Sequence, residues 1–131
     1  MHTPSLAGVR VLLVDDDEYV REALRDYFVE CGAIVVTADS GRIAFDAFRQ
    51  APPDVLVSDI RMPGEDGFWL IAAVRALRPC EGGDVPAVAV TRDIIAATRA
   101  MASGFQAVHE KPPCLPELVA LVERLAGCCK P

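Results

Sequence analysis

The hydrophobic positions of the chain follow two different spacings in turn. Short runs of apolar, often β-branched residues end abruptly at polar residues, which is typical of buried strands. Between these runs, apolar residues recur every three or four positions among charged ones, as on helices that bury one face. The pattern predicts five strands, at residues 9–14, 33–37, 54–58, 86–90 and 107–109.

A helix is predicted after each strand. Ser40 is a suitable N-cap for the second helix, and Pro52 ends it. Gly32 and Gly104 stop two others. The four helices other than the second, including the two that Gly32 and Gly104 stop, are predicted within residues 17–30, 68–77, 94–102 and 115–125. Because strand–helix–strand crossovers are right-handed, this alternation predicts an α/β fold: a parallel five-stranded sheet with helices on both faces.

The composition fits one globular domain. The 131 residues are 52% hydrophobic and 24% charged, which is enough apolar material for one core. The formal net charge of −6 argues against a general attraction to nucleic acid or to an anionic membrane. No apolar run approaches the ~18 residues of a membrane-spanning helix, and the first residues lack the order of a signal peptide. We therefore expect a cytoplasmic protein that binds neither nucleic acid nor membrane directly.

The cysteines indicate neither a disulfide framework nor a zinc site. Their number is odd, no pair has Cys-x-x-Cys spacing, and only two histidines accompany them. The five cysteines are Cys31, Cys80, Cys114, Cys128 and Cys129. For the adjacent pair Cys128 and Cys129, in the expected C-terminal tail, we favour incidental thiols over a redox or metal role.

Chemically reactive side chains gather where predicted strands end. Asp15 and Asp16 follow the first strand, Asp59 the third, Thr91 the fourth, and Lys111 comes shortly after the fifth. Since ligands of such folds bind beyond the carboxyl ends of the strands, we expect these side chains to converge. Neighbouring carboxylates repel one another, and Mg²⁺, which prefers oxygen ligands, relieves the repulsion. Acids at a helix start also serve as caps, but Asp59 from a separate strand favours a metal site.

Together these positions resemble the receiver domain of two-component response regulators. The motifs are the acid pair Asp15-Asp16, Asp-x-x-Met-Pro-x-x-Asp-Gly from Asp59 to Gly67, Thr91, and Lys111-Pro112. The resemblance covers residues 8–126 and leaves short tails at residues 1–7 and 127–131. Residues 86–111 also resemble the receivers of hybrid histidine kinases. The family implies a flavodoxin-like, doubly wound sheet in the order 2-1-3-4-5 with five helices.

The resemblance implies a phosphorylation site. Asp59 is the implied phosphoacceptor, and Thr91 and Lys111 are the implied contacts of the phosphoryl oxygens. The implied peptide bond between Lys111 and Pro112 is cis. The implied chemistry is Mg²⁺-dependent self-phosphorylation and self-dephosphorylation at Asp59, so we do not expect a turnover enzyme.

The resemblance also implies a metal site. Asp16 and Asp59 are its direct ligands, Asp15 helps to orient the ion, and the backbone carbonyl of Arg61 completes the protein ligands. The expected ion is Mg²⁺, for which Mn²⁺ is a substitute.

The implied phosphoryl donor is a phosphohistidine on a sensor histidine kinase or a histidine phosphotransfer domain. We expect it to dock against the first helix, whose exposed face includes Tyr19, Glu22 and Arg25. A homodimer is a further implied assembly, formed through the last two strands and the helices that follow them.

Two positions depart from the family pattern. Arg92 follows Thr91, where receivers usually have a small residue, and Val108 stands where many have Tyr or Phe. A valine cannot change orientation as an aromatic ring does, so the departure concerns the output of the signal more than its chemistry. We hypothesise that Arg61 and Arg92, which flank the site, set the lifetime of the phosphate by controlling the access of water.

Two other functions compete with this interpretation. A phosphorylation-independent interaction module with a receiver-like fold is compatible with Arg92 and Val108. A phosphatase of the haloacid dehalogenase type would use Asp15 as its nucleophile, within Asp15-Asp16-Asp17. The phosphatase family requires a later acidic pair that this chain lacks, so we expect that function least.

Overall fold

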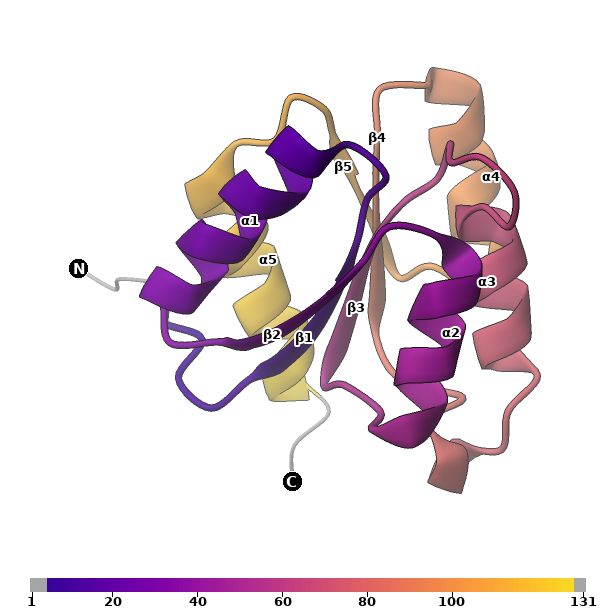
Figure 1. Cartoon of the computed structure of the whole chain (residues 1–131), viewed down its shortest axis with the longest axis horizontal. Coiled ribbons are helices and arrows are strands. Elements are labelled where there is room, and N and C mark those ends of the chain that lie inside the picture. Colours follow the sequence, from indigo (N-terminus) through magenta and orange to yellow (C-terminus); the bar gives the residue numbers. More distant parts are fainter. Residues whose placement is uncertain (1–4, 129–131) are drawn as a thin grey trace.

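All five predicted strands form, and they join in one parallel sheet (Figure 1). The computed structural model describes residues 5–128, so residues 1–4 and 129–131 of the expected tails, with Cys129, lie outside the described residues. The strands are β1 (Arg10–Val14), β2 (Ile34–Ala38), β3 (Val55–Asp59), β4 (Ala87–Thr91) and β5 (Ala107–Glu110). Their order is β2-β1-β3-β4-β5, which confirms the order that the resemblance implies.

Five helices cover the two faces of the sheet. They are α1 (Glu18–Glu30), α2 (Gly41–Gln50), α3 (Gly67–Arg75), α4 (Ile94–Ser103) and α5 (Leu115–Cys128). Figure 1 shows α1 and α5 on one face and α2, α3 and α4 on the other. The connection after α3 contains a 3-10 turn, η1 (Pro79–Glu81). None of the helices within residues 5–128 combines the length and the apolar character needed to cross a membrane.

Four strands extend one residue beyond their predicted ends. Two of them, β3 and β4, were expected to stop before Asp59 and Thr91 because these side chains are polar, yet both residues close their strands. Backbone pairing does not depend on that polarity, and Asp59 pairs with Val90 while Thr91 pairs with Glu110. The sheet therefore holds the two side chains in place through the backbone.

Four helices begin at an N-cap whose side-chain oxygen accepts backbone N–H groups of the first turn. These caps are Asp17 for α1, Ser40 for α2, Asp66 for α3 and Asp93 for α4. Such contacts satisfy amides that the first turn of a helix leaves unpaired. The capping interpretation of the acidic stretch therefore holds for Asp17, the third acid.

Two hydrophobic layers, one on each face, fix the sheet between the helices. Side chains of β1 alternate between them: Leu13 packs in the layer of α1 and α5 with Phe28, and Leu12 in the opposite layer with Phe48. Leu6 is also fully buried in the first layer, although the sequence pattern placed it in a tail. The packed structure thus begins before residue 8.

Gly67, the first residue of α3, packs directly against the end of β3. A methyl group here would overlap the carbonyl oxygen of Asp59 and would lie 2.8 Å from Cα of Ile60. Because the crowded atoms are backbone, we expect Gly67→Ala to lower the free energy of unfolding by about 1–3 kcal/mol, measured by urea denaturation. The control is Gly127→Ala in α5, where a methyl group meets nothing within 4 Å. Equal stability of the two variants would contradict this account.

Candidate functional site

Lys111, which follows the outermost strand β5, contacts two aspartates at the ends of the inner strands β1 and β3. Nζ of Lys111 lies 2.8 Å from Oδ2 of Asp15 and 3.2 Å from Oδ2 of Asp59. All three side chains are at most 9% exposed. Asp15 follows β1, Asp59 ends β3 and Lys111 follows β5, so three distant segments meet at the carboxyl edge. This convergence is the one that the sequence predicts.

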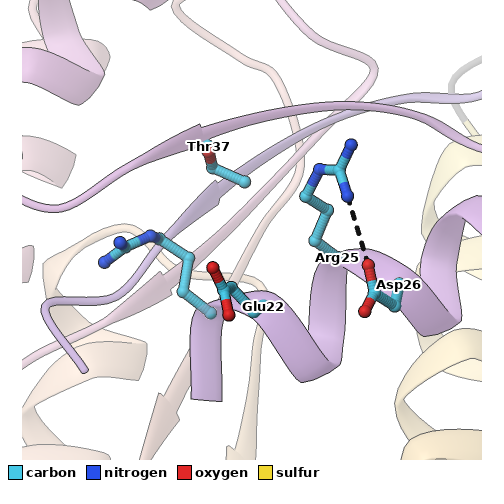
Figure 2. Close-up of a pocket in the computed structure, with 5 residues that line it drawn as sticks. Glu22, Arg25, Asp26 and Thr37 are labelled. Carbon is cyan, nitrogen blue, oxygen red and sulfur yellow. Dashed lines mark hydrogen bonds and ion pairs between the residues drawn. The ribbon is translucent and has the colours of Figure 1, made fainter. Parts of the chain in front are cut away.

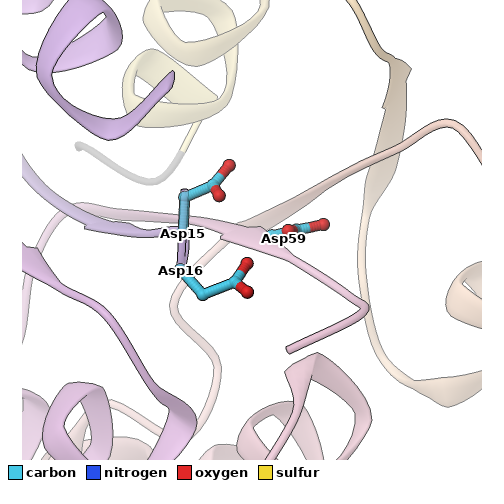
Figure 3. A group of neighbouring side chains, drawn as sticks. All are labelled: Asp15, Asp16 and Asp59. Atoms are coloured by element: carbon cyan, nitrogen blue, oxygen red, sulfur yellow. The ribbon is translucent and has the colours of Figure 1, made fainter. Parts of the chain in front are cut away.

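The side chains of the adjacent acids Asp15 and Asp16 point in different directions (Figure 3), and their surroundings differ. Asp15 is buried, and its Oδ1 accepts the backbone N–H of Asp17 at 2.9 Å while its Oδ2 faces Lys111. Asp16 is exposed, and within residues 5–128 no donor contacts its carboxylate. Both oxygens of Asp15 are thus engaged by the protein, whereas Asp16 is free to bind an ion directly.

The three carboxylates carry more negative charge than Lys111 compensates. One ligand oxygen from each of Asp15, Asp16 and Asp59 can be chosen so that all lie within 4.8 Å of one another. Two unit charges 4 Å apart interact by about 4 kcal/mol at an effective dielectric constant of about 20. Three carboxylates against one ammonium therefore favour a further cation. An oxygen-only donor set open to solvent at Asp16 fits Mg²⁺, which keeps several of its own waters.

The environment shifts the pKa of Asp59 and the pKa of Lys111. Burial raises the pKa of the Asp59 carboxyl, the charge of Asp15 raises it further, and Lys111 only partly opposes both. The N–H of Ile60, which donates to Oδ1 of Asp59 at 2.8 Å, also opposes the rise. For Lys111, burial works to lower the pKa, but the hydrogen bond to Asp15 and the charge of Asp59 together raise it. Lys111 thus stays charged while Asp59 gains its proton more readily than an ordinary carboxyl.

Thr91 lies beside this pair and is tied to it through the backbone. The N–H of Lys111 donates to the carbonyl of Thr91 at 3.1 Å. The Lys111–Pro112 peptide bond is cis, as the resemblance implies. Thr91 is buried but lines the same surface cleft as Asp16, Asp59 and Lys111. The cleft therefore brings together the side chains that the sequence predicts for metal and phosphoryl binding, except the buried Asp15.

One contact at the cleft is not apparent from the sequence. The guanidinium of Arg61 donates from Nε and Nη2 to Oδ2 of Asp93, at 3.2 and 2.9 Å. This hydrogen bond, with those from the N–H groups of Ala96 and Ile95, holds the pKa of Asp93 below its usual range. Arg92 is exposed and also lines the cleft. An acid directly before a helical pattern signals a cap, but nothing local identifies a partner 32 positions away.

A second hollow lies on the outer side of α1, against β2 (Figure 2). It is lined by Arg21, Glu22, Arg25, Asp26 and Thr37. Arg25 pairs with Asp26 at 3.1 Å, and two arginines balance two acids, so the hollow has no excess charge to attract an anion. Its link to the cleft is Arg21, whose Nη1 donates to the carbonyl of Asp15 at 2.9 Å.

Comparison with known sequences identifies one family. The sequence model of the response regulator receiver domain matches residues 11–123. An uncharacterized 14.6 kDa protein of Leptolyngbya boryana is 38% identical over 122 residues, which cover 92% of each chain. The DNA-binding transcriptional regulator NtrC of Klebsiella pneumoniae is 37% identical over 114 residues, or 86% of this chain and 24% of NtrC. The match thus spans about a quarter of that regulator.

Solved structures give the same result for the fold. A provisionally assigned response regulator from Chloroflexus aurantiacus superimposes with a TM-score of 0.86 at 30% identity, covering 92% of this chain and 98% of that one. The receiver domain of the sensor histidine kinase PA1611 from Pseudomonas aeruginosa gives a TM-score of 0.84 at 25% identity, with 92% and 99% covered. That structure has a magnesium ion coordinated in its active-site cleft.

The raised pKa of Asp59 gives a testable pH dependence. A carboxyl that holds its proton more tightly in the folded state stabilises the fold at low pH, and this contribution is lost as pH rises through the folded pKa. At neutral pH the charged group is therefore a cost, and we expect Asp59→Asn to raise the free energy of unfolding by on the order of 1 kcal/mol without metal.

Thermal and urea unfolding in a chelating buffer measure this effect. The gain from Asp59→Asn should shrink as pH falls toward the ordinary carboxyl range of about 4. Asp39→Asn, at an exposed acid beside the end of β2, is the matched control and should change stability little at any pH. A destabilised Asp59→Asn protein at neutral pH would disprove the assigned direction.

Proposed function

The chain belongs to the response regulator receiver domain family, and we propose that it is a phosphoacceptor in a two-component phosphorelay. In this proposal a phosphoryl group passes from a phosphohistidine to Asp59 with Mg²⁺ bound, and the modified surface controls a partner. The observation that carries the proposal is the double contact of Lys111 with Asp15 and Asp59, beside the unpaired carboxylate of Asp16.

The transfer step follows from the groups at the cleft. An oxygen of Asp59 attacks phosphorus in line with the donor imidazole; a P–O bond forms as the P–N bond breaks, and the electron pair stays on the imidazole nitrogen. Lys111 offers its ammonium to the phosphoryl oxygens, because Nζ already lies 3.2 Å from the attacking carboxylate. The hydroxyl of Thr91 donates to another phosphoryl oxygen.

The metal site of the proposal uses the open side of the cleft. Asp16, Asp59 and the backbone carbonyl of Arg61 would hold the ion, and Asp15 would orient it through water because its own oxygens face Asp17 and Lys111. A bound Mg²⁺ would supply positive charge to the phosphoryl oxygens. Mn²⁺, with the same preference for oxygen ligands, substitutes.

The proposed donor is a sensor histidine kinase or a histidine phosphotransfer domain that docks on α1. Tyr19 is 86% exposed and borders an apolar groove formed with Val20, Leu24, Pro113 and Leu115. This groove lies between the start of α1 and the segment that follows Lys111, so a helix seated there can present its histidine to Asp59. The proposed homodimer uses a different face, that of β4, α4, β5 and α5.

The proposal assigns this chain a signalling role in the cytoplasm. The chemistry at Asp59 modifies the chain itself, so no separate substrate is turned over. A net charge of −6 supports the expectation that these residues do not contact nucleic acid directly. NtrC has DNA-binding activity, but most of NtrC lies outside the aligned quarter.

Phosphorylation is tested by intact-mass spectrometry after incubation with acetyl phosphate and Mg²⁺. We expect one phosphoryl adduct that needs Mg²⁺ and is lost in Asp59→Asn, because Asp59 both contacts Lys111 and lines the open cleft, whereas Asp15 contacts Lys111 but does not line the cleft. Asp39→Asn, another acid at the same edge of the sheet, is the control and should retain the adduct.

Each competing function predicts a different result. No adduct on folded protein, with acetyl phosphate or with a phosphohistidine donor, would indicate a phosphorylation-independent interaction module. Sustained release of phosphate from a phosphomonoester, abolished by Asp15→Asn, would indicate the phosphatase. Asp15 is 1% exposed with both carboxylate oxygens engaged, which disfavours it as a nucleophile.

The lifetime of the phosphate tests the flanking arginines. If Arg61 and Arg92 restrict the access of water, Arg61→Ala and Arg92→Ala should each shorten the half-life of the phosphorylated form several-fold. Loss of radiolabelled phosphate in chelating buffer measures the half-life. Arg42→Ala, at an exposed arginine of α2, should decay like the wild type. Wild-type decay in both cleft variants would contradict the hypothesis.

A further inference from the structure

Asp93 joins the cleft to the first turn of α4 through hydrogen bonds with four residues. Its Oδ2 accepts the guanidinium of Arg61, and its Oδ1 accepts the N–H groups of Ile95 and Ala96 at 2.9 and 3.2 Å. Its own N–H donates to Oγ1 of Thr91 at 3.1 Å. Arg61 and Thr91, two residues that line the cleft beside Asp59, thus both contact the residue that caps α4.

The contact between Arg61 and Asp93 is weak enough to be exchanged. The side chains are 61% and 33% exposed, and ion pairs at such solvent-screened positions contribute little to stability. A phosphoryl group on Asp59 offers several oxygens and about −2 of charge, and guanidinium binds phosphate oxygens in a bidentate, charge-assisted manner. Competition for Arg61 therefore favours the phosphoryl group over the single oxygen of Asp93.

We propose that Arg61 tethers α4 to the cleft through Asp93, and that phosphorylation of Asp59 transfers Arg61 from Asp93 to the phosphoryl group and releases the first turn of α4. This inference rests on the proposed function for its trigger, while the tether itself is independent of it. Once Arg61 has left, the carboxylate of Asp93 faces a phosphoryl group of like charge without a compensating cation. Repulsion then moves the cap of α4 away from the cleft.

The released turn carries an apolar surface. Ile94 and Ile95 are 74% and 78% exposed, and they directly follow the cap. A change in the position of Asp93 therefore changes how these two side chains are presented. The device requires no aromatic ring at position 108, where the partly buried Val108 packs in the layer of α2, α3 and α4.

Amide exchange in α4 tests the proposal. The exchange rates of the Ile95 and Ala96 amides are measured by NMR with Mg²⁺, before and after acetyl phosphate, and intact mass gives the phosphorylated fraction of each sample. We expect phosphorylation to speed exchange of both amides several-fold in the wild type. In Arg61→Gln the tether is absent, so exchange should already be fast without phosphate and should change little on phosphorylation.

Two further variants separate the tether from helix capping. Asp93→Ser retains a hydroxyl that caps α4 but removes the carboxylate that binds Arg61, so it should behave like Arg61→Gln. Arg42→Gln removes an exposed arginine whose partner is Asp46 in the same helix, and it should behave like the wild type. Wild-type rates in both Asp93→Ser and Arg61→Gln would overturn the tether.

Different results would refute the release of α4 and the phosphorylation of Asp59. A phosphorylated wild type with unchanged exchange at Ile95 and Ala96 would refute the release of α4 while leaving the phosphoacceptor in place. Absence of any phosphoryl adduct would refute the proposed function and, with it, the phosphorylation trigger. In that case the comparison of unphosphorylated wild type with Arg61→Gln still decides whether the tether exists.

Discussion

The contact of the Lys111 ammonium with the Asp15 and Asp59 carboxylates is the interaction on which the whole site depends. Two buried carboxylates at the ends of neighbouring strands repel each other, and an unpaired buried charge costs several kcal/mol. Lys111, which follows the outermost strand β5, offsets much of that cost. Its backbone N–H donates to the carbonyl of Thr91 at the end of β4. The ion pair therefore positions Asp59 and joins the segment after β5 to the end of β4.

Lys111 does not neutralise all of the negative charge of the carboxylates. The remaining negative charge gives the site its chemistry. The pKa of Asp59 stays raised despite Lys111, and Asp16 faces solvent with no donor from residues 5–128 at its carboxylate. A site with this excess of negative charge favours the binding of a cation. It also responds strongly to any change in the charge of Asp59, because the surrounding groups are already in electrostatic competition.

The two sides of the cleft differ in rigidity. Asp59 and Thr91 end strands that are paired with their neighbours, so the backbone on this side resists displacement. On the other side, Arg61 and Asp93 meet in an exposed ion pair at the start of a helix. In the proposed release of α4, a change of charge at the centre of the cleft therefore acts on the helix side, since distorting the strands requires breaking backbone hydrogen bonds. This asymmetry gives a direction to the proposed signal, from Asp59 toward α4.

The sequence alone determined the alternation of strands and helices and the convergence of its acids, Thr91 and Lys111 at one edge, because local periodicity and strand polarity carry that information. It misjudged the ends of β3 and β4 by one residue, since side-chain polarity hides backbone pairing that continues through Asp59 and Thr91. Only the tertiary structure showed that Leu6 belongs to the core, that Asp15 is engaged where Asp16 is free, and that Arg61 reaches Asp93. Those facts depend on which distant side chains meet, and contacts between residues far apart in the chain leave no local pattern.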